Sequence, residues 1–176
     1  GTQAMWNVMA DYKNGPLAVA AVYKKLDKQD NAATNNGKYE WGVGANYDFQ
    51  VVKVGLGYQK QNLKTAAAYG KTSDLYSVWG IVPVGDKLSL IAQYATAEGD
   101  KKVAAGTVGG DSWAIGAKYS LSKRTTLYAT YAEVDLEKGA GLSSFWNNSG
   151  GMGNTNPALE AGQKANAYQM GIIHSF

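Results

Sequence analysis

The feature that most constrains this chain is an alternation of large apolar residues with small or polar ones, which recurs along nearly the whole sequence. The last nine residues show it clearly, because every second position is large and mostly apolar: Tyr168, Met170, Ile172, His174 and Phe176. A period of two residues is the pattern of a β-strand with one apolar face. The chain is therefore predicted to be all-β.

Nine segments share this alternation, and they fall into two interleaved sets. Segments of the first set open with Trp or Tyr and cover residues 6–12, 41–49, 76–84, 113–121 and 168–176. Segments of the second set close with Tyr and cover residues 17–23, 52–58, 88–94 and 125–131. In an antiparallel meander, each closing Tyr would lie level with the Trp or Tyr that opens a neighbouring segment. The pattern predicts two aromatic rings with an aliphatic band between them.

The connections between these segments alternate in length. Short turns with hairpin-type residues are expected at KNGP (13–16), QV (50–51), GD (85–86) and SK (122–123). The other connections are expected to be long polar loops over residues 27–38, 62–74, 99–112 and 136–165. Loops of this length count against a compact soluble domain. Short turns at one end and long loops at the other are typical of a transmembrane β-barrel.

The contents of the apolar stripes indicate that they face lipid. Aliphatic residues between two Trp and Tyr rings match a bilayer core and its two interfaces. Six to eight residues, with a rise of about 3.3 Å and a tilt of about 40°, span roughly 15–20 Å, near the usual apolar band of about 25 Å. A soluble β-barrel or sandwich with its large residues turned inward is the alternative. The predicted lipid-interface aromatics are Trp6, Tyr12, Tyr23, Trp41, Tyr47, Tyr58, Tyr94, Trp113, Tyr119, Tyr131, Tyr168 and Phe176.

The opposite face is polar and dotted with glycine, as expected for the wall of a water-filled lumen. The predicted pore-lining residues are Asp11, Lys24, Glu40, Asp48, Lys53, Lys87, Gln93, Lys118 and Arg124. This set holds two more cations than anions, and charged rings bias which ions enter a pore. The excess predicts a mild preference for anions. The alternative is that a constriction outside this chain sets the selectivity.

Two segments carry a family resemblance. The ending MGIIHSF resembles the C-terminal strand of Gram-negative general porins of the β-proteobacterial type, with Gly171, His174 and Phe176 at matching positions. That family commonly has Arg where Ile173 stands, so one lumen charge is missing here. The segment YSLSKRTTLYATYAEVD (119–135) resembles the family's last periplasmic turn and the strand after it.

The resemblance implies a bacterial outer-membrane protein that assembles as a homotrimer. Its expected function is that of a general diffusion porin, a channel for small hydrophilic solutes and ions, and its expected surroundings are outer-membrane lipid and lipopolysaccharide. Such porins have sixteen strands, and counting back from the tail gives this chain strands eight to sixteen. Bacterial single-chain barrels have even strand numbers, and an open edge in lipid is costly. We therefore expect residues 1–176 to be the C-terminal portion of one barrel domain, without the N-terminal strands and the inward-folded third loop.

The residues that support catalysis or cofactor binding in other proteins are sparse here. The chain has no Cys and a single His, His174, which falls on the apolar stripe, so neither a metal site nor a Ser-His-Asp arrangement is expected. YGKTSD lacks the first glycine of a phosphate-binding loop, because Thr65 stands at that position. A net charge of +3 is too weak to indicate nucleic acid. No cofactor is expected, and the alternatives to a channel are a small plugged adhesive barrel and an outer-membrane enzyme.

Overall fold

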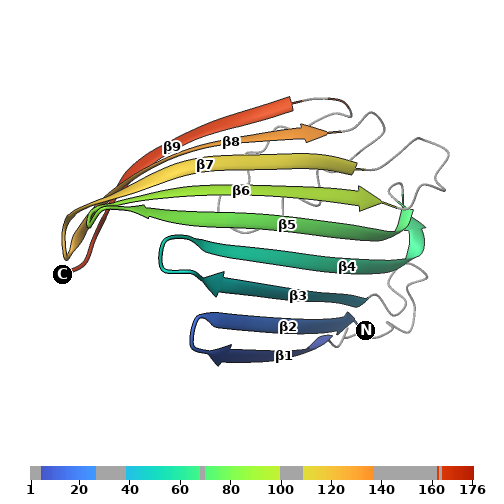
Figure 1. The fold of residues 1–176 in the computed structure, drawn as a ribbon. Helices are drawn as coiled ribbons and strands as arrows, with labels where there is room; N and C mark the ends of the chain where they lie inside the picture. The colour runs from blue at the N-terminus through green and yellow to red at the C-terminus, as the bar shows by residue number, and fades with distance from the viewer. Residues whose placement is uncertain (1–4, 27–38, 68–69, 100–108, 137–161, 163) are drawn as a thin grey trace.

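The computed structural model describes residues 5–26, 39–67, 70–99, 109–136, 162 and 164–176. These residues form one antiparallel sheet of nine strands in chain order (Figure 1), so the predicted meander is confirmed. The described residues contain no helix with the length and apolarity that crossing a membrane requires. The strands are β1 (Met5–Asn14), β2 (Leu17–Leu26), β3 (Tyr39–Asp48), β4 (Lys53–Ala67), β5 (Gly70–Val84), β6 (Leu88–Gly99), β7 (Gly109–Ser122), β8 (Thr125–Leu136) and β9 (Lys164–His174).

The four predicted short turns are confirmed, and they lie together at one end of the sheet (Figure 1). Gly15 and Gly85 adopt positive φ angles of 54° and 61° in the turns that follow β1 and β5, a conformation that glycine adopts without strain. Gln50, between β3 and β4, has a positive φ of 71°. Its main-chain N–H donates to Oδ1 of Asp48 at 2.8 Å, so Asp48 stabilises this turn.

The predicted long loop at residues 62–74 is wrong. Strand β4 continues to Ala67 and β5 begins at Gly70, and their register pairs include Asn62 with Thr72 and, after a shift in register, Ala67 with Gly70. Polar residues pair across the two strands at the start of this extension, as in Lys60 with Asp74 and Asn62 with Thr72. Strands β7 and β9 also begin inside predicted loops, at Gly109 and Lys164. Strands β6 and β8 end inside predicted loops as well, at Gly99 and Leu136. Apart from Gly162, the rest of the predicted loops, including all of residues 27–38, lies outside the described residues.

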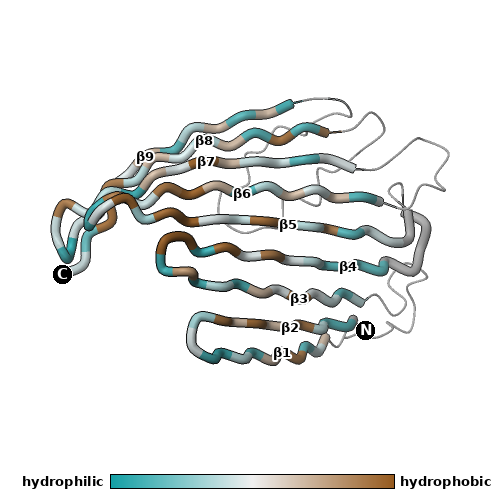
Figure 2. The backbone as a smooth tube through the Cα atoms, in the orientation of Figure 1, coloured by the Kyte–Doolittle hydropathy of each residue, from teal (hydrophilic) through white to brown (hydrophobic). Residues whose placement is uncertain are grey.

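The sheet is a single layer with two unlike faces. We call the face that carries the aromatic and aliphatic stripes the apolar face, and its opposite the polar face. Among the described residues, only Ala97 and Leu136 are buried hydrophobic residues, whereas Leu56 and Ile115 on the apolar face are 61% and 53% exposed. Hydrophobic and hydrophilic residues are interspersed along the strands (Figure 2). Because the sheet covers so little of this apolar surface itself, another apolar medium has to cover it.

Candidate functional site

One row of aromatic rings crosses the apolar face toward the end with the long connections. We call this row the aromatic belt. Five pairs of neighbouring belt rings have centroids 4.8 to 5.3 Å apart, a separation at which ring pairs add about 0.5–1.5 kcal/mol each. These contacts join Trp6 with Tyr23, Trp41 with Tyr58 and Tyr76, and Trp113 with Tyr131 and Tyr168. The belt takes one residue from each strand: Trp6, Tyr23, Trp41, Tyr58, Tyr76, Tyr94, Trp113, Tyr131 and Tyr168.

The strand register confirms the predicted alignment of closing and opening aromatics. The directly paired residues are Tyr23 with Trp41, Tyr58 with Tyr76, Tyr94 with Trp113, and Tyr131 with Tyr168. At the other strand boundaries the belt steps by two residues; Trp41, for example, pairs with Lys60, although the belt residue of β4 is Tyr58. The belt thus advances by one residue per strand on average. With a rise of about 3.3 Å and a strand spacing of about 4.8 Å, this offset corresponds to a tilt of about 35°, as in transmembrane barrels.

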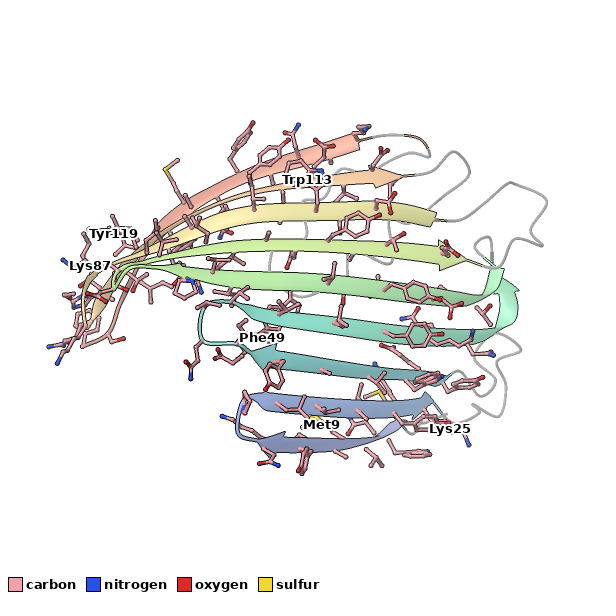
Figure 3. All side chains as sticks on the ribbon, in the orientation of Figure 1. Met9, Lys25, Phe49, Lys87, Trp113 and Tyr119 are labelled. Carbon is pink, nitrogen blue, oxygen red and sulfur yellow. The ribbon has the colours of Figure 1, made fainter. Side chains whose placement is uncertain are left out.

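The second aromatic row, at the short-turn end of the same face, is sparser than the belt. It contains Tyr12, Tyr47, Tyr119 and Phe176, and Figure 3 shows Trp113 and Tyr119 at two different heights of the sheet. Phe49 joins this row, with its ring centroid 4.6 Å from that of Tyr47. The set of predicted interface aromatics left out Phe49 and Tyr76, although both belong to the predicted apolar stripes, and it also left out Tyr39 next to the belt. All the predicted interface aromatics lie on the apolar face, and their contact with lipid stays a prediction.

Beyond the belt, toward the long connections, the apolar face becomes polar. Asp74 accepts hydrogen bonds from the hydroxyl of Tyr58 and from Nζ of Lys60, the latter at 3.0 Å to Oδ1. Lys164 Nζ lies 2.8 Å from Oδ2 of Asp135 in the neighbouring strand. These cross-strand pairs stand where a bilayer changes from hydrocarbon to headgroups, if the belt marks the interface.

Seven of the predicted pore-lining residues lie in strands on the polar face, and two lie in short turns. The two turn residues are Lys87 and Arg124, and Figure 3 shows Lys87 at the short-turn end of the sheet. The strand residues are Asp11, Lys24, Glu40, Asp48, Lys53, Gln93 and Lys118. The structure describes this placement, and the pore-lining role stays a prediction.

The register brings some of these charged residues together. Lys24 pairs with Glu40, and Asp48 pairs with Lys53. Glu40 also accepts hydrogen bonds from two amide side chains of β4, those of Gln59 and Gln61.

Arg124 has a different environment from the strand residues. Its Nε donates to the main-chain carbonyl of Ser175 at 2.7 Å, and the Ser175 N–H donates to the Arg124 carbonyl at 2.9 Å. Arg124 therefore connects the β7–β8 turn to the residues after β9.

Charge is unevenly distributed with height on the polar face. Heights are counted here in residues from the belt aromatic of the same strand. The polar-face positions one and three residues from the belt toward the short turns are uncharged in all nine strands, and we call these two levels the waist. The polar-face positions five and seven residues from the belt, in the same direction, carry five cations and two anions. We call this charged set the turn-side collar: Asp11, Lys13, Asp48, Lys53, Lys87, Lys118 and Arg124.

Two aromatic residues on the polar face were missed by the sequence prediction. Trp79 pairs with Gly55, and Tyr128 pairs with Gly171. A Cβ atom on Gly55 would lie 2.1 Å from the indole, and one on Gly171 would lie 2.6 Å from the Tyr128 hydroxyl, so each ring occupies the space that its glycine leaves open. The alternation of the sequence could have placed both rings on the polar face, because each stands between two residues of an apolar stripe.

The described residues hold little that could support catalysis. His174 lies on the apolar face, with its Nδ1 atom 2.9 Å from Oγ1 of Thr125. Within the described ranges, no three His, Cys, Asp or Glu side chains group as they would around a metal ion.

The single-layer sheet, its tilt and its aromatic belt define a wall of an antiparallel transmembrane β-barrel. A sequence profile of Gram-negative porins matches residues 1–139, so the chain belongs to the Gram-negative porin family, and its location is the bacterial outer membrane. An outer membrane porin protein of Bordetella pertussis is 30% identical over 145 residues, which cover 67% of this chain and 37% of that protein. The resemblance noted in the sequence is thereby confirmed.

Solved structures show the same fold at lower identity. The anion-selective porin from Comamonas acidovorans aligns with a TM-score of 0.69 and 23% identity, covering 96% of this chain and 48% of that one. OmpT, an outer membrane protein of Vibrio cholerae, aligns with a TM-score of 0.68 and 18% identity, covering 98% of this chain and 55% of that one. Its trimer form aligns with a TM-score of 0.60 and 18% identity, covering 95% and 56%. The chain thus spans about half the length of these solved structures.

Proposed function

We propose that this chain forms part of the wall of a water-filled channel through which small hydrophilic solutes and ions cross the outer membrane by diffusion, without catalysis. The observation that carries the proposal is the contrast between the faces. Aliphatic side chains are exposed on one face, as at Leu56 and Ile115. The predicted pore-lining charges and most amides and glycines lie on the other, among apolar residues such as Val22 and Ile91. Residues 1–176 would supply the C-terminal portion of one barrel domain.

The proposed mechanism follows from this contrast. The aliphatic band meets lipid hydrocarbon, and the aromatic rows fix its height at the two interfaces. Antiparallel pairing between consecutive strands gives backbone N–H and C=O groups partners inside the wall, which hydrocarbon cannot supply. The polar face keeps water and dissolved ions in the lumen. The trimer form of OmpT supports assembly of this protein as a homotrimer. Its proposed surroundings are outer-membrane lipid and lipopolysaccharide.

The turn-side collar supports a mild preference for anions. Its five cations and two anions leave an excess of three positive charges at one mouth of the channel. A charged ring at a mouth raises the local concentration of the opposite ion. One structural neighbour is itself an anion-selective porin.

Single-channel recording tests both parts of the proposal. The protein, purified from outer membranes and placed in planar bilayers, should give steady ohmic steps, and a KCl gradient should give a reversal potential on the anion-selective side. Lys53→Glu combined with Lys118→Glu should move that potential toward cation selectivity. Lys60→Glu, on the apolar face, is the control and should leave it unchanged. Lack of ohmic steps would favour a plugged barrel. Equal reversal potentials in all variants would show that the turn-side collar does not set the ion selectivity.

A further inference from the structure

Trp79 is the largest side chain at the waist. On β5 it pairs with Gly55 on one side and with Gln93 on the other. Its indole atoms Cε2, Cζ2 and Nε1 lie at similar distances, 2.1, 2.3 and 2.4 Å, from the position of a Cβ atom on Gly55. Near-equal distances to three bonded ring atoms indicate that the indole covers the glycine with its face. The opposite face of the ring is therefore directed away from the sheet wall.

A hollow of about 340 Å³ lies beside this indole, over strands β1 to β3. Its floor on the polar face is made of small residues: Ala18, Ala20 and Gly44. Its polar lining comes from Asp11, Lys13 and Asn46, and Trp79 contributes the aromatic surface. A mostly apolar hollow with a few polar groups at its edge is the usual form of a small-molecule site, and this volume is at the lower end of the usual range of about 300–1,000 Å³.

The polar groups that line the hollow, and those in the register row of Trp79, indicate which ligand would fit. Asp11 and Lys13 carry opposite charges, so the hollow favours neither a free anion nor a free cation. Asn46 and Gln93 lie in the same register row as Trp79, on either side of it, and their amides both donate and accept hydrogen bonds. A ligand that matches this set has hydroxyl groups around its rim and C–H groups on its flat face.

We propose that Trp79 and this hollow form a binding subsite for a neutral, ring-shaped polyol, that is, a sugar unit stacked on the indole. The hydroxyl groups of this unit would meet Asn46, and further units of a saccharide that extends along the hollow would meet Asp11 and Lys13. The subsite rests on the proposed channel function, because it places the sugar on the lumen wall. The proposal adds a class of solute, sugars, that would bind transiently to the channel wall during passage.

Calorimetric titration of the detergent-solubilised protein, purified from outer membranes, with maltotriose tests the subsite without requiring conductance. Maltotriose should bind, and Trp79→Ala should weaken binding by about tenfold or more, the scale of one lost stacking contact. Trp79→Phe, which keeps an aromatic face, should retain most of the affinity. Trp113→Phe, on the apolar face, is the matched control and should leave binding unchanged. Absence of maltotriose binding, or equal affinity in the Trp79→Ala variant, overturns the proposal.

Asn46→Ala supplies a second variant that leaves the indole in place. It should weaken maltotriose binding by roughly threefold, because one hydrogen-bonding group is lost. Unchanged affinity in this variant would overturn the assignment of Asn46 to the subsite.

Conductance of the same preparation separates this proposal from the channel proposal. If the protein gives ohmic steps that maltotriose does not reduce, and calorimetry detects no binding, the sugar subsite is overturned and the channel proposal is retained. Binding that depends on Trp79 in a protein without ohmic steps supports the subsite and contradicts the channel.

Discussion

The apolar and polar faces of this sheet share the same strands and the same alternation, but different rules set their side chains. On the apolar face, height determines the residue type, because aromatic rows border an aliphatic band. On the polar face, the neighbouring strand often determines it: Trp79 stands opposite Gly55, and Tyr128 stands opposite Gly171. On this sheet the apolar face is thus specified strand by strand, whereas parts of the polar face are specified by pairs of strands.

The largest expected effect comes from placing a charge in the aliphatic band. Ile115→Lys should lower the free energy of unfolding by about 2–4 kcal/mol, because the side chain is 53% exposed and would meet hydrocarbon. Gln93→Lys, on the polar face of the neighbouring strand, should change it by less than about 0.5 kcal/mol. Urea unfolding of the protein folded into lipid vesicles measures both. Similar losses in the two variants would show that the faces are assigned wrongly.

A smaller effect is expected from filling the space beneath a polar-face ring. Gly55→Ala should cost about 1–3 kcal/mol, because its Cβ atom would lie 2.1 Å from Cε2 of Trp79 and force the indole to move. Gly44→Ala is the matched control, since the nearest atom to its Cβ, the Leu56 carbonyl oxygen, is 3.5 Å away. The same unfolding assay compares them.

The double variant of Gly55→Ala with Trp79→Ala sharpens this second prediction. Removal of the indole should make the added methyl group nearly neutral, which a double-mutant cycle records as a coupling energy. Additive losses in the cycle would contradict a specific fit between the ring and the glycine.

The smallest effect is expected at the polar rim beyond the belt. Asp74→Asn should cost about 0.5–1 kcal/mol, because it weakens the contact with Lys60, whose side chain is 34% exposed. The loss should shrink at high ionic strength, since salt screens exposed ion pairs. Glu98 is the register partner of Asp74 on β6, so Glu98→Gln removes a like charge beside it and should not lower the stability. A loss that does not change with salt would mean that the hydrogen bond with Tyr58 dominates.

The sequence was sufficient for the parts of the fold that depend on single strands. The closing Tyr23 and the opening Trp41 could be paired in advance, because each stands at a fixed place in its own stripe. The extension of β4 and β5 into residues 62–74 could not be predicted, since paired strands above the aliphatic band, as at Asn62 and Thr72, are polar and resemble a loop in the sequence. Trp79 was missed for a related reason, because its partner Gly55 is identified only once the register is known.

The stepping of the aromatic belt has a consequence for how such a wall can change. The two-residue offset occurs across each short-turn hairpin, as between Trp41 and Tyr58, and the belt is level across each boundary between hairpins. Each hairpin thus contains one complete step of the belt, and its first and last strands have belt aromatics level with those of the adjoining hairpins. The circumference of such a barrel can therefore change by whole hairpins while the belt of every remaining strand keeps its height. The gain or loss of a lone strand would place the belt aromatics of the remaining strands at unequal heights.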